Sequence, residues 1–220
     1  MNIGIIGAGH IGGSLTRRFT ALGHQVFVAN SRGPETLAAL AQETGATPVT
    51  VNEAAHSGDV VIVTIPERNI PELPGDLFAG VPDSVVVVDT GNYYPQQRDG
   101  RIAGIEEGTV ESVWVSQQLG QPVVKAFNNI YAEHLLKKGQ PAGTPGRIAL
   151  PVAGDDERAK AIVLKLVDEL GFDAVDAGGL DESWRQQPGT PVYAADFDAE
   201  GVRQALSEAS KERKPEWQAK

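Results

Sequence analysis

The sequence contains no cysteine, and this absence excludes several classes of site at once. Without thiols there is no disulfide, no thiolate nucleophile, no iron–sulfur cluster and no cysteine-ligated zinc. Histidine is scarce too, and the four that occur show no metal-ligand spacing such as HExxH: His10, His24, His56 and His134. We therefore expect no metal site.

Long apolar runs and excess basic charge are also lacking. The apolar runs 60–65 and 85–88 have the length of strands, far below the roughly 20 residues of a membrane helix. The first residues show no basic segment followed by an apolar stretch, so we expect no signal peptide, no membrane partner and a cytoplasmic location. The net charge of −10 argues against a nucleic-acid partner, which requires a basic face.

Short β-rich runs alternate with helical patterns over most of the 220 residues. The run Val85–Val88 is apolar on both faces, which is typical of a central parallel strand covered by helices on each side. This alternation predicts an α/β fold, a Rossmann-type, doubly wound and mostly parallel sheet. The expected strands lie near 2–6, 25–29, 47–50, 59–65, 84–89, 122–126, 148–153 and 172–175, and the expected helices at 10–22, 34–44, 155–170 and 200–213.

Two further features of the pattern bear on the site. We expect a cap from Asp155 at the start of the helix 155–170. Residues 90–108 are predicted as one long loop, rich in Gly, Asn, Tyr and Gln, and a loop of that length in a compact domain is often functional.

The segment Gly7-Ala8-Gly9-His10-Ile11-Gly12 follows the first strand and opens the first helix. A GxGxxG in this context indicates a dinucleotide site, since its glycines allow a tight turn and close approach of the pyrophosphate. The start of the helix offers free N–H groups to the phosphates. The alternative is a glycine turn without a ligand. We expect Gly7, Gly9, His10, Ile11 and Gly12 to contact the cofactor.

The end of the second strand distinguishes the two nicotinamide cofactors. An NAD enzyme usually carries an acid about 20 residues after the motif, to hold the ribose 2′-OH. Here Asn30-Ser31-Arg32 occupy that place, and no acid occurs before Glu35. Arg32 can pair with a 2′-phosphate while Ser31 donates a hydrogen bond, which favours NADP(H). The alternative is that Arg32 is simply an exposed loop arginine.

Further candidates follow the carboxyl ends of later strands, which border the crevice where strand order reverses. Pro66 could also merely end a strand, and loop tyrosines are often half-buried without a role. We expect Ile65, Pro66, Gly91 and Asn92 beside the cofactor, with Tyr93 and Tyr94 as walls of a substrate pocket.

The sixth strand leads into a pair of asparagines and then a short helical pattern. Asn128 and Asn129 could hydrogen-bond a carboxamide or a flat heterocycle, or could cap the following helix. His134 could donate a proton, although a lone histidine on a short helix is more often structural. Asn128 and His134 are the candidate catalytic residues.

Together GIIGAGHIGGSL, the Asn-Ser-Arg turn, TIP, VVKAFNNI and VDAGGL resemble the NADP oxidoreductases that depend on the deazaflavin coenzyme F420, and more weakly the related ferric-reductase oxidoreductase domains. The resemblance covers roughly residues 1–182, which gives an NADP-binding domain at 1–182 and a C-terminal extension with one helix at 183–220. It implies Gly9, His10 and Ile11 at the pyrophosphate.

The same resemblance implies Ser31 and Arg32 at the 2′-phosphate, and Ile65 and Pro66 beside the nicotinamide. The implied reaction is direct hydride transfer between NADPH and a small planar acceptor, with coenzyme F420 or a flavin as candidates. It needs two rings in position rather than a strong acid or base. A homodimer is also implied.

This sequence departs from the family pattern in two places. It has Gly9-His10 where the family usually has a Thr-Gly pair, and its segment 184–193 lacks the helical character expected of the deazaflavin enzymes. The acceptor pocket is therefore expected to differ in part. The basic residues that could meet an anionic acceptor are Arg98, Arg101, Lys125 and Arg185.

Two other functions fit the same motifs. One is an imine or carbonyl reductase related to pyrroline carboxylate reductases or β-hydroxyacid dehydrogenases, which normally append a large helical domain. The roughly 40 residues after Leu180 are too few for that domain, which places this alternative second. The other is a non-enzymatic NADPH-binding sensor, because a fold does not fix a function.

Overall fold

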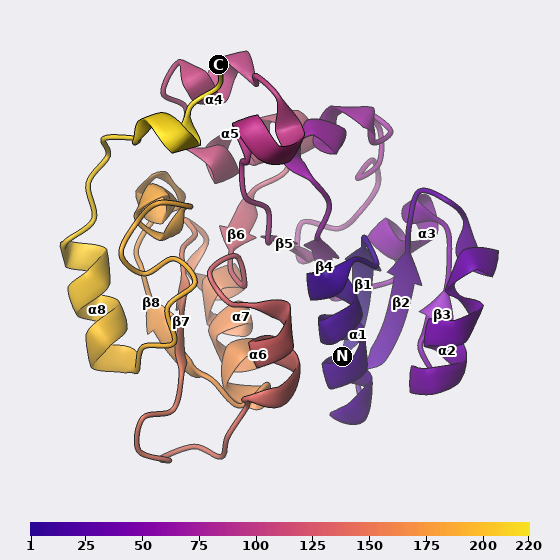
Figure 1. The fold of residues 1–220 in the computed structure, drawn as a ribbon. Coiled ribbons are helices and arrows are strands. Elements are labelled where there is room, and N and C mark those ends of the chain that lie inside the picture. Colours follow the sequence, from indigo (N-terminus) through magenta and orange to yellow (C-terminus); the bar gives the residue numbers. More distant parts are fainter.

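A parallel β-sheet forms the centre of the computed structural model, which describes residues 1–220 (Figure 1). Its strand order is β3-β2-β1-β4-β5-β6, and every pair of neighbours is parallel. The strands are β1 (Asn2–Ile6), β2 (Gln25–Ala29), β3 (Thr47–Pro48), β4 (Val60–Val63), β5 (Val86–Asp89) and β6 (Val123–Lys125). This order is that of the Rossmann fold and confirms the predicted fold class.

Two groups of buried side chains fill the two faces of this sheet, because its central strands are apolar at every position. In β4, Val60 and Ile62 join the core of one face while Val61 and Val63 join that of the other. The first face is covered by α1 (His10–Ala21), α6 (Ala132–Lys137) and α7 (Glu157–Glu169), with α2 (Ala38–Thr44) beside α1. The second face is covered by α3 (Val51–His56) and α5 (Glu111–Leu119).

The last two strands form a sheet of their own. Strands β7 (Ala149–Val152) and β8 (Asp173–Asp176) pair in parallel, and one antiparallel bridge between Lys125 and Ala153 links them to β6. Helix α8 (Ala199–Ser207) packs Val202, Ala205 and Leu206 against this small sheet. Helix α8 thereby packs on the rest of the protein. A 3₁₀ helix over Leu180–Gln186 spans the domain boundary predicted after residue 182.

Two predicted helix boundaries are wrong. Asp156, not Asp155, caps α7 and accepts from the N–H groups of Arg158 and Ala159, whereas Asp155 accepts from the N–H of Leu180. Helix α8 ends at Ser207 rather than at residue 213. Its apolar face ends at Leu206, and residues 211–214 are charged, so continuing the helix would bury nothing more.

The predicted loop 90–108 contains two short helical elements, which corrects that prediction in part. It contains a π-helical turn at Pro95–Asp99 and the short helix α4 (Ala103–Glu106). The buried Asp99 carboxylate accepts from the N–H of Tyr94 at 2.7 Å, and this bond holds the turn closed.

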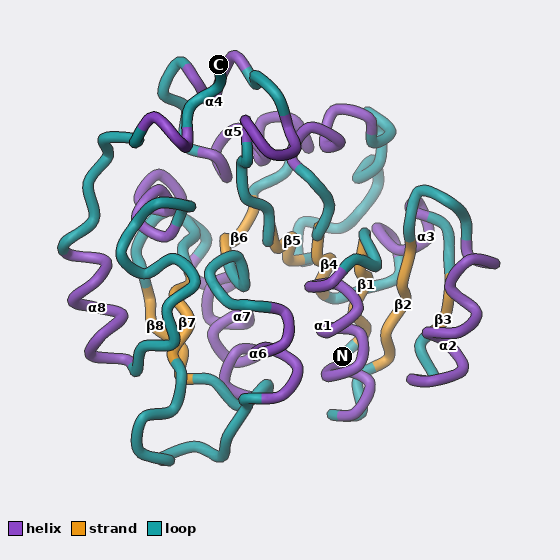
Figure 2. The backbone as a smooth tube through the Cα atoms, in the orientation of Figure 1, coloured by secondary structure: helices purple, strands orange, loops and turns teal.

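Beyond α8 the chain runs without regular structure to a single 3₁₀ turn at Pro215–Trp217, and its end lies near α4 (Figure 2). The N–H of Ala219 donates to the carboxylate of Glu106. No helix has both the length and the apolar character needed to cross a bilayer.

Candidate dinucleotide site

The glycine-rich turn between β1 and α1 has the geometry that the motif predicts. Gly7 has a φ of 111°, and a Cβ at Gly7 would collide with the carbonyl oxygen of Thr64. A Cβ at Gly12 would collide with the carbonyl oxygen of Gly7. At Gly9 no atom lies within 4 Å of the place a Cβ would take, so this position faces open space. Gly7 and Gly12 permit close packing, and Gly9 leaves room for a ligand.

The first turn of α1 presents free hydrogen-bond donors. Gly9 is the N-cap and supplies no side-chain acceptor, and the first bond of the helix runs from the N–H of Gly13 to the carbonyl of Gly9. The N–H groups of His10, Ile11 and Gly12 therefore have no partner within the helix. Such donors at the positive end of a helix dipole suit an anionic group such as a pyrophosphate.

The turn after β2 presents a free cation. The Asn30 side chain accepts from the N–H of Arg32 at 2.9 Å and donates to the Thr36 hydroxyl at 2.9 Å, which fixes the turn. Ser31 and Arg32 are exposed, and the Arg32 guanidinium forms no ion pair or hydrogen bond with the protein. It is available for a phosphate.

A cleft of about 580 Å³ joins these two turns. It lies over the carboxyl ends of β1 and β4, where the strand order reverses. Seven of the predicted cofactor residues line it: Gly7, Gly9, Asn30, Ser31, Arg32, Ile65 and Pro66. The structure thus brings these residues into one site, with His10, Ile11 and Gly12 on the adjoining start of α1.

One wall of the cleft was not predicted from the sequence. Asn69, Glu72, Leu73 and Pro74 belong to or follow a 3₁₀ helix over Glu67–Glu72. A signal for this wall exists in the three prolines at 66, 71 and 74, which cannot continue a central strand and so turn the chain across the sheet edge.

Residues 2–93 match the family model described as NADP oxidoreductase, coenzyme F420-dependent. The structure of the hypothetical protein SMa0349 from Sinorhizobium meliloti is similar to this chain at a TM-score of 0.74, with 34% sequence identity, and the match covers 90% of this chain and 94% of that one. The chain belongs to this oxidoreductase family. Its N-terminal Rossmann domain is the part that carries the family match.

Two further proteins are similar to this chain, one in fold and one over part of its sequence. A protein from Arthrobacter sp. FB24, provisionally named an F420-dependent NADP-reductase, has a similar fold, with a TM-score of 0.65, 22% identity, and coverage of 81% of this chain and 85% of that one. The Escherichia coli (strain K12) protein YjhV is 45% identical over 71 residues, which are 32% of this chain and 52% of YjhV. The chain thus spans about half the length of this curated relative.

The rim of the sheet beyond β5, where the predicted residues Gly91 and Asn92 lie outside the lining of the cleft, is held by a buried ion pair. The Lys125 ammonium lies 2.9 Å from the Asp89 carboxylate and donates to the Gly91 carbonyl at 2.6 Å, while the other Asp89 oxygen accepts from the Gly91 N–H at 2.7 Å. Burial lowers the pKa of Lys125, but the attraction of Asp89 and its neighbours outweighs burial and raises it overall. Lys125 fixes the position of Gly91, and its proposed contact with an anionic acceptor is wrong, since its side chain is fully buried.

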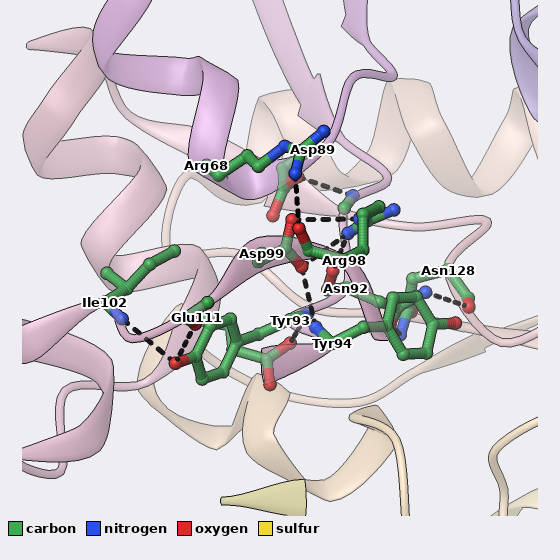
Figure 3. Close-up of polar contacts among 12 residues, drawn as sticks. Arg68, Asp89, Asn92, Tyr93, Tyr94, Arg98, Asp99, Ile102, Glu111 and Asn128 are labelled. Atoms are coloured by element: carbon green, nitrogen blue, oxygen red, sulfur yellow. Dashed lines mark hydrogen bonds and ion pairs between the residues drawn. The ribbon is translucent and has the colours of Figure 1, made fainter. Parts of the chain in front are cut away.

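The remaining basic candidates differ in their availability. Arg98 pairs with Asp99 at 2.9 Å and donates to the Asn92 carbonyl (Figure 3). Arg185 pairs with Glu182. Arg101 is exposed and makes no such pair. Of the four arginines and lysines considered for an anionic acceptor, Arg101 alone has a free charged group.

The side chain of Asn128 connects three segments behind the rim. Its Nδ2 donates to Asn92 Oδ1 at 3.0 Å (Figure 3). The same Nδ2 donates to the Gln186 carbonyl at 2.7 Å, and Asn128 Oδ1 accepts from Gln186 Nε2. Both amide protons are therefore used within the protein. The alternative role for the asparagine pair, a cap on the following helix, is wrong, because Tyr131 is the N-cap of α6 and no side chain bonds there.

His134 and the two tyrosines lie in different environments. The His134 ring bonds to Asp196 at 2.9 Å and thereby ties α6 to the chain before α8. Tyr93 is fully buried, its hydroxyl donating to the Gly100 carbonyl, so it walls no pocket and that expectation is wrong. Tyr94 is half-buried, and its hydroxyl contacts that of Tyr193.

Acidic side chains gather beneath this rim. Burial, followed by repulsion from Glu111, raises the pKa of Glu67 well above its ordinary value. Burial is also the main cause that raises the pKa of Glu111 to about 7, although the nearby Lys125 opposes it. Both carboxyls therefore hold a proton more readily than an exposed glutamate does.

Proposed function

We propose that this chain is an NADP(H)-dependent oxidoreductase that transfers a hydride between NADPH and a small planar acceptor. The observation that carries the proposal is the single cleft that joins the free N–H groups of α1 to the free Arg32 guanidinium. One end of the cleft suits a pyrophosphate, and the other suits a second, terminal phosphate. NADP(H) carries both a pyrophosphate and a 2′-phosphate, whereas NAD(H) lacks the 2′-phosphate.

The cofactor assignment distributes the residues of the cleft as follows. The N–H groups of His10 and Ile11 would hold the pyrophosphate, with Gly9 leaving space for it. Ser31 and Arg32 would hold the 2′-phosphate, while the Asn30 side chain fixes their turn. The remaining rim, with Ile65, Pro66, Gly91 and Asn92, would adjoin the nicotinamide half.

The cofactor, when bound, supplies the hydride, so the protein mainly has to orient its ring and exclude water. The Lys125–Asp89 pair fixes both the carbonyl and the N–H of Gly91, so the backbone at Gly91 would be a rigid support beside the ring. Asn128 supports the rim through Asn92 and acts as a positioning residue rather than as a proton donor. The family description makes coenzyme F420 the first acceptor to test and a flavin the second.

The substitution Arg32→Ala tests the cofactor assignment. Removing a charge-assisted contact worth about 1.5–3 kcal/mol should weaken NADPH binding by roughly 10- to 150-fold. NADH binding should not change, since NADH has no 2′-phosphate. Arg203→Ala removes an exposed arginine on α8, outside the cleft, and serves as the control. An equal loss for NADPH and NADH would contradict the assignment.

Turnover tests the second half of the proposal. NADPH oxidation, followed by nicotinamide absorbance, is measured with coenzyme F420, FMN, FAD, a ferric chelate and a cyclic imine. Turnover with a planar acceptor that is lost in Arg32→Ala supports the proposed oxidoreductase. Turnover with the imine alone would favour an imine reductase, and tight NADPH binding without any turnover would favour a sensor.

A further inference from the structure

Glu67 is a buried carboxyl that follows Pro66, a residue of the cleft wall. It begins the 3₁₀ helix Glu67–Glu72 and has 0% of its surface exposed. No protein group donates a hydrogen bond to either of its oxygens. On its other side is Gly91, where a Cβ would lie 3.2 Å from Glu67 Oε1. Glu67 thus adjoins Pro66 in the chain and Gly91 in space, two residues that the proposed function places beside the ring.

The charged groups that face Glu67 leave it without a cation of its own. Glu111 of α5 and Asp89 of β5 repel its negative form, as does Asp99 of the π-helical turn. Lys125 of β6 attracts it, but Lys125 is already paired with Asp89 at 2.9 Å. The positive charge of Arg98 is likewise paired with Asp99, and that of Arg213 acts on Glu111.

A carboxyl that is buried, accepts no hydrogen bond and is surrounded by other acids is held in its neutral form. This neutrality can be reversed by a positive charge brought close to it, because an opposite charge favours ionisation. The nicotinamide ring is such a charge in the oxidised cofactor only, since the reduced ring is neutral. The two redox states therefore place different demands on Glu67.

We propose that Glu67 makes this site sensitive to the redox state of the cofactor: binding of NADP⁺ ionises Glu67, and binding of NADPH leaves it neutral. The proton of the carboxyl passes to solvent, and the carboxylate that remains balances the charge of the ring. Because binding and ionisation are linked reciprocally, raising the pH must strengthen NADP⁺ binding relative to NADPH. This inference rests on the proposed function, since it requires that the cleft bind both forms.

The experiment measures proton release and affinity by titration calorimetry of the full chain with NADP⁺ and with NADPH, in buffers of different ionisation enthalpy. The 2′-phosphate is common to both ligands, so protons exchanged by that phosphate cancel in the difference. Wild-type protein should release more protons with NADP⁺. The ratio of the NADPH to the NADP⁺ affinity should fall with rising pH, by at most about tenfold per pH unit for one proton.

Glu67→Gln keeps the shape of the neutral carboxyl but has no proton to release. This variant should bind NADPH as wild type does, lose the difference in proton release, and show an affinity ratio independent of pH. Retained NADPH binding also shows that the variant folds. Glu107→Gln is the control, because Glu107 is exposed, screened by water and lies outside the cleft.

The outcomes separate the inference from the proposed function. Equal proton release for NADP⁺ and NADPH in wild-type protein, or a difference that persists in Glu67→Gln, overturns the role of Glu67 while the proposed function stands. Failure of wild-type protein to bind either form overturns both.

Discussion

At the scale of single residues, the three glycines of the first turn are needed for different reasons, and substitution can separate them. A methyl group at Gly12 would meet the Gly7 carbonyl, so Gly12→Ala should destabilise the fold by about 1–3 kcal/mol. A methyl group at Gly9 would meet no protein atom, and its φ of −73° suits alanine. Gly9→Ala should therefore unfold as wild type does but bind NADPH at least about tenfold more weakly, because the methyl occupies the space proposed for the pyrophosphate.

Urea unfolding and NADPH titration of the two variants check this contrast. Full NADPH affinity in Gly9→Ala would show that no phosphate approaches that position. An unchanged free energy of unfolding in Gly12→Ala would mean that the first helix can shift away from β1, contrary to its close packing.

At the scale of elements, the sequence predicted those parts whose pattern is local. Strand β1, the turn at Gly7 and helix α1 follow from an apolar run, a glycine motif and a helical periodicity that adjoin in the chain. Helices α3 and α5 were not predicted, since α3 is only 6 residues long and α5 has little one-sided apolar character. Their burial is decided by the sheet they cover, which no short window of sequence contains.

The site shows the same division. Arg32 could be predicted because its place after β2 follows from the fold, and the structure leaves it free. Lys125 and Asn128 were assigned to ligands, but their partners Asp89, Asn92 and Gln186 are distant in sequence and come together only at the carboxyl edge of the sheet. Polar residues at such an edge can either hold the fold together or contact a ligand, and the residue type alone does not distinguish the two roles.

The junction of α5 with the rim carries a pH-dependent contribution to stability. Burial raises the pKa of Glu111 to about 7 in the folded protein, against 4.5 ordinarily, so the folded state binds more protons between these values. The contribution of Glu111 to the free energy of unfolding is therefore fully present below about pH 4.5 and is lost as the pH rises through about 7. The loss amounts to about 1–3 kcal/mol. Urea unfolding as a function of pH should show a shallower fall in Glu111→Gln. Glu107→Gln, an exposed neighbour, should leave the slope unchanged, and an equal slope in all three proteins would contradict the assignment.

At the scale of the whole molecule, the C-terminal segment 208–220 returns to the side of the protein that carries α4 (Figure 1). Gln96 donates to the carbonyls of Pro215 and Gln218, and Trp217 packs against the rings of Tyr94 and Tyr193 at 6.0 and 6.4 Å between centroids. Most other side chains of the segment are exposed, so one aromatic residue provides most of its apolar contact. Local opening of this segment should thus be independent of the unfolding of the sheet.

Limited trypsin digestion tests this independence, because Lys211, Arg213 and Lys214 lie within the segment. Trp217→Ala removes about 1–2 kcal/mol of partly buried apolar contact, so cleavage there should become roughly 5- to 30-fold faster. The midpoint of thermal unfolding should stay within about 2 °C of wild type, since the two sheets keep their own cores. Glu216→Ala, an exposed neighbour, controls for the change of sequence near the cleavage sites. If Trp217→Ala is cleaved as slowly as wild type, the segment is held by its polar contacts with Gln96 and Glu106; if its unfolding midpoint falls sharply, the segment belongs to the cooperative core.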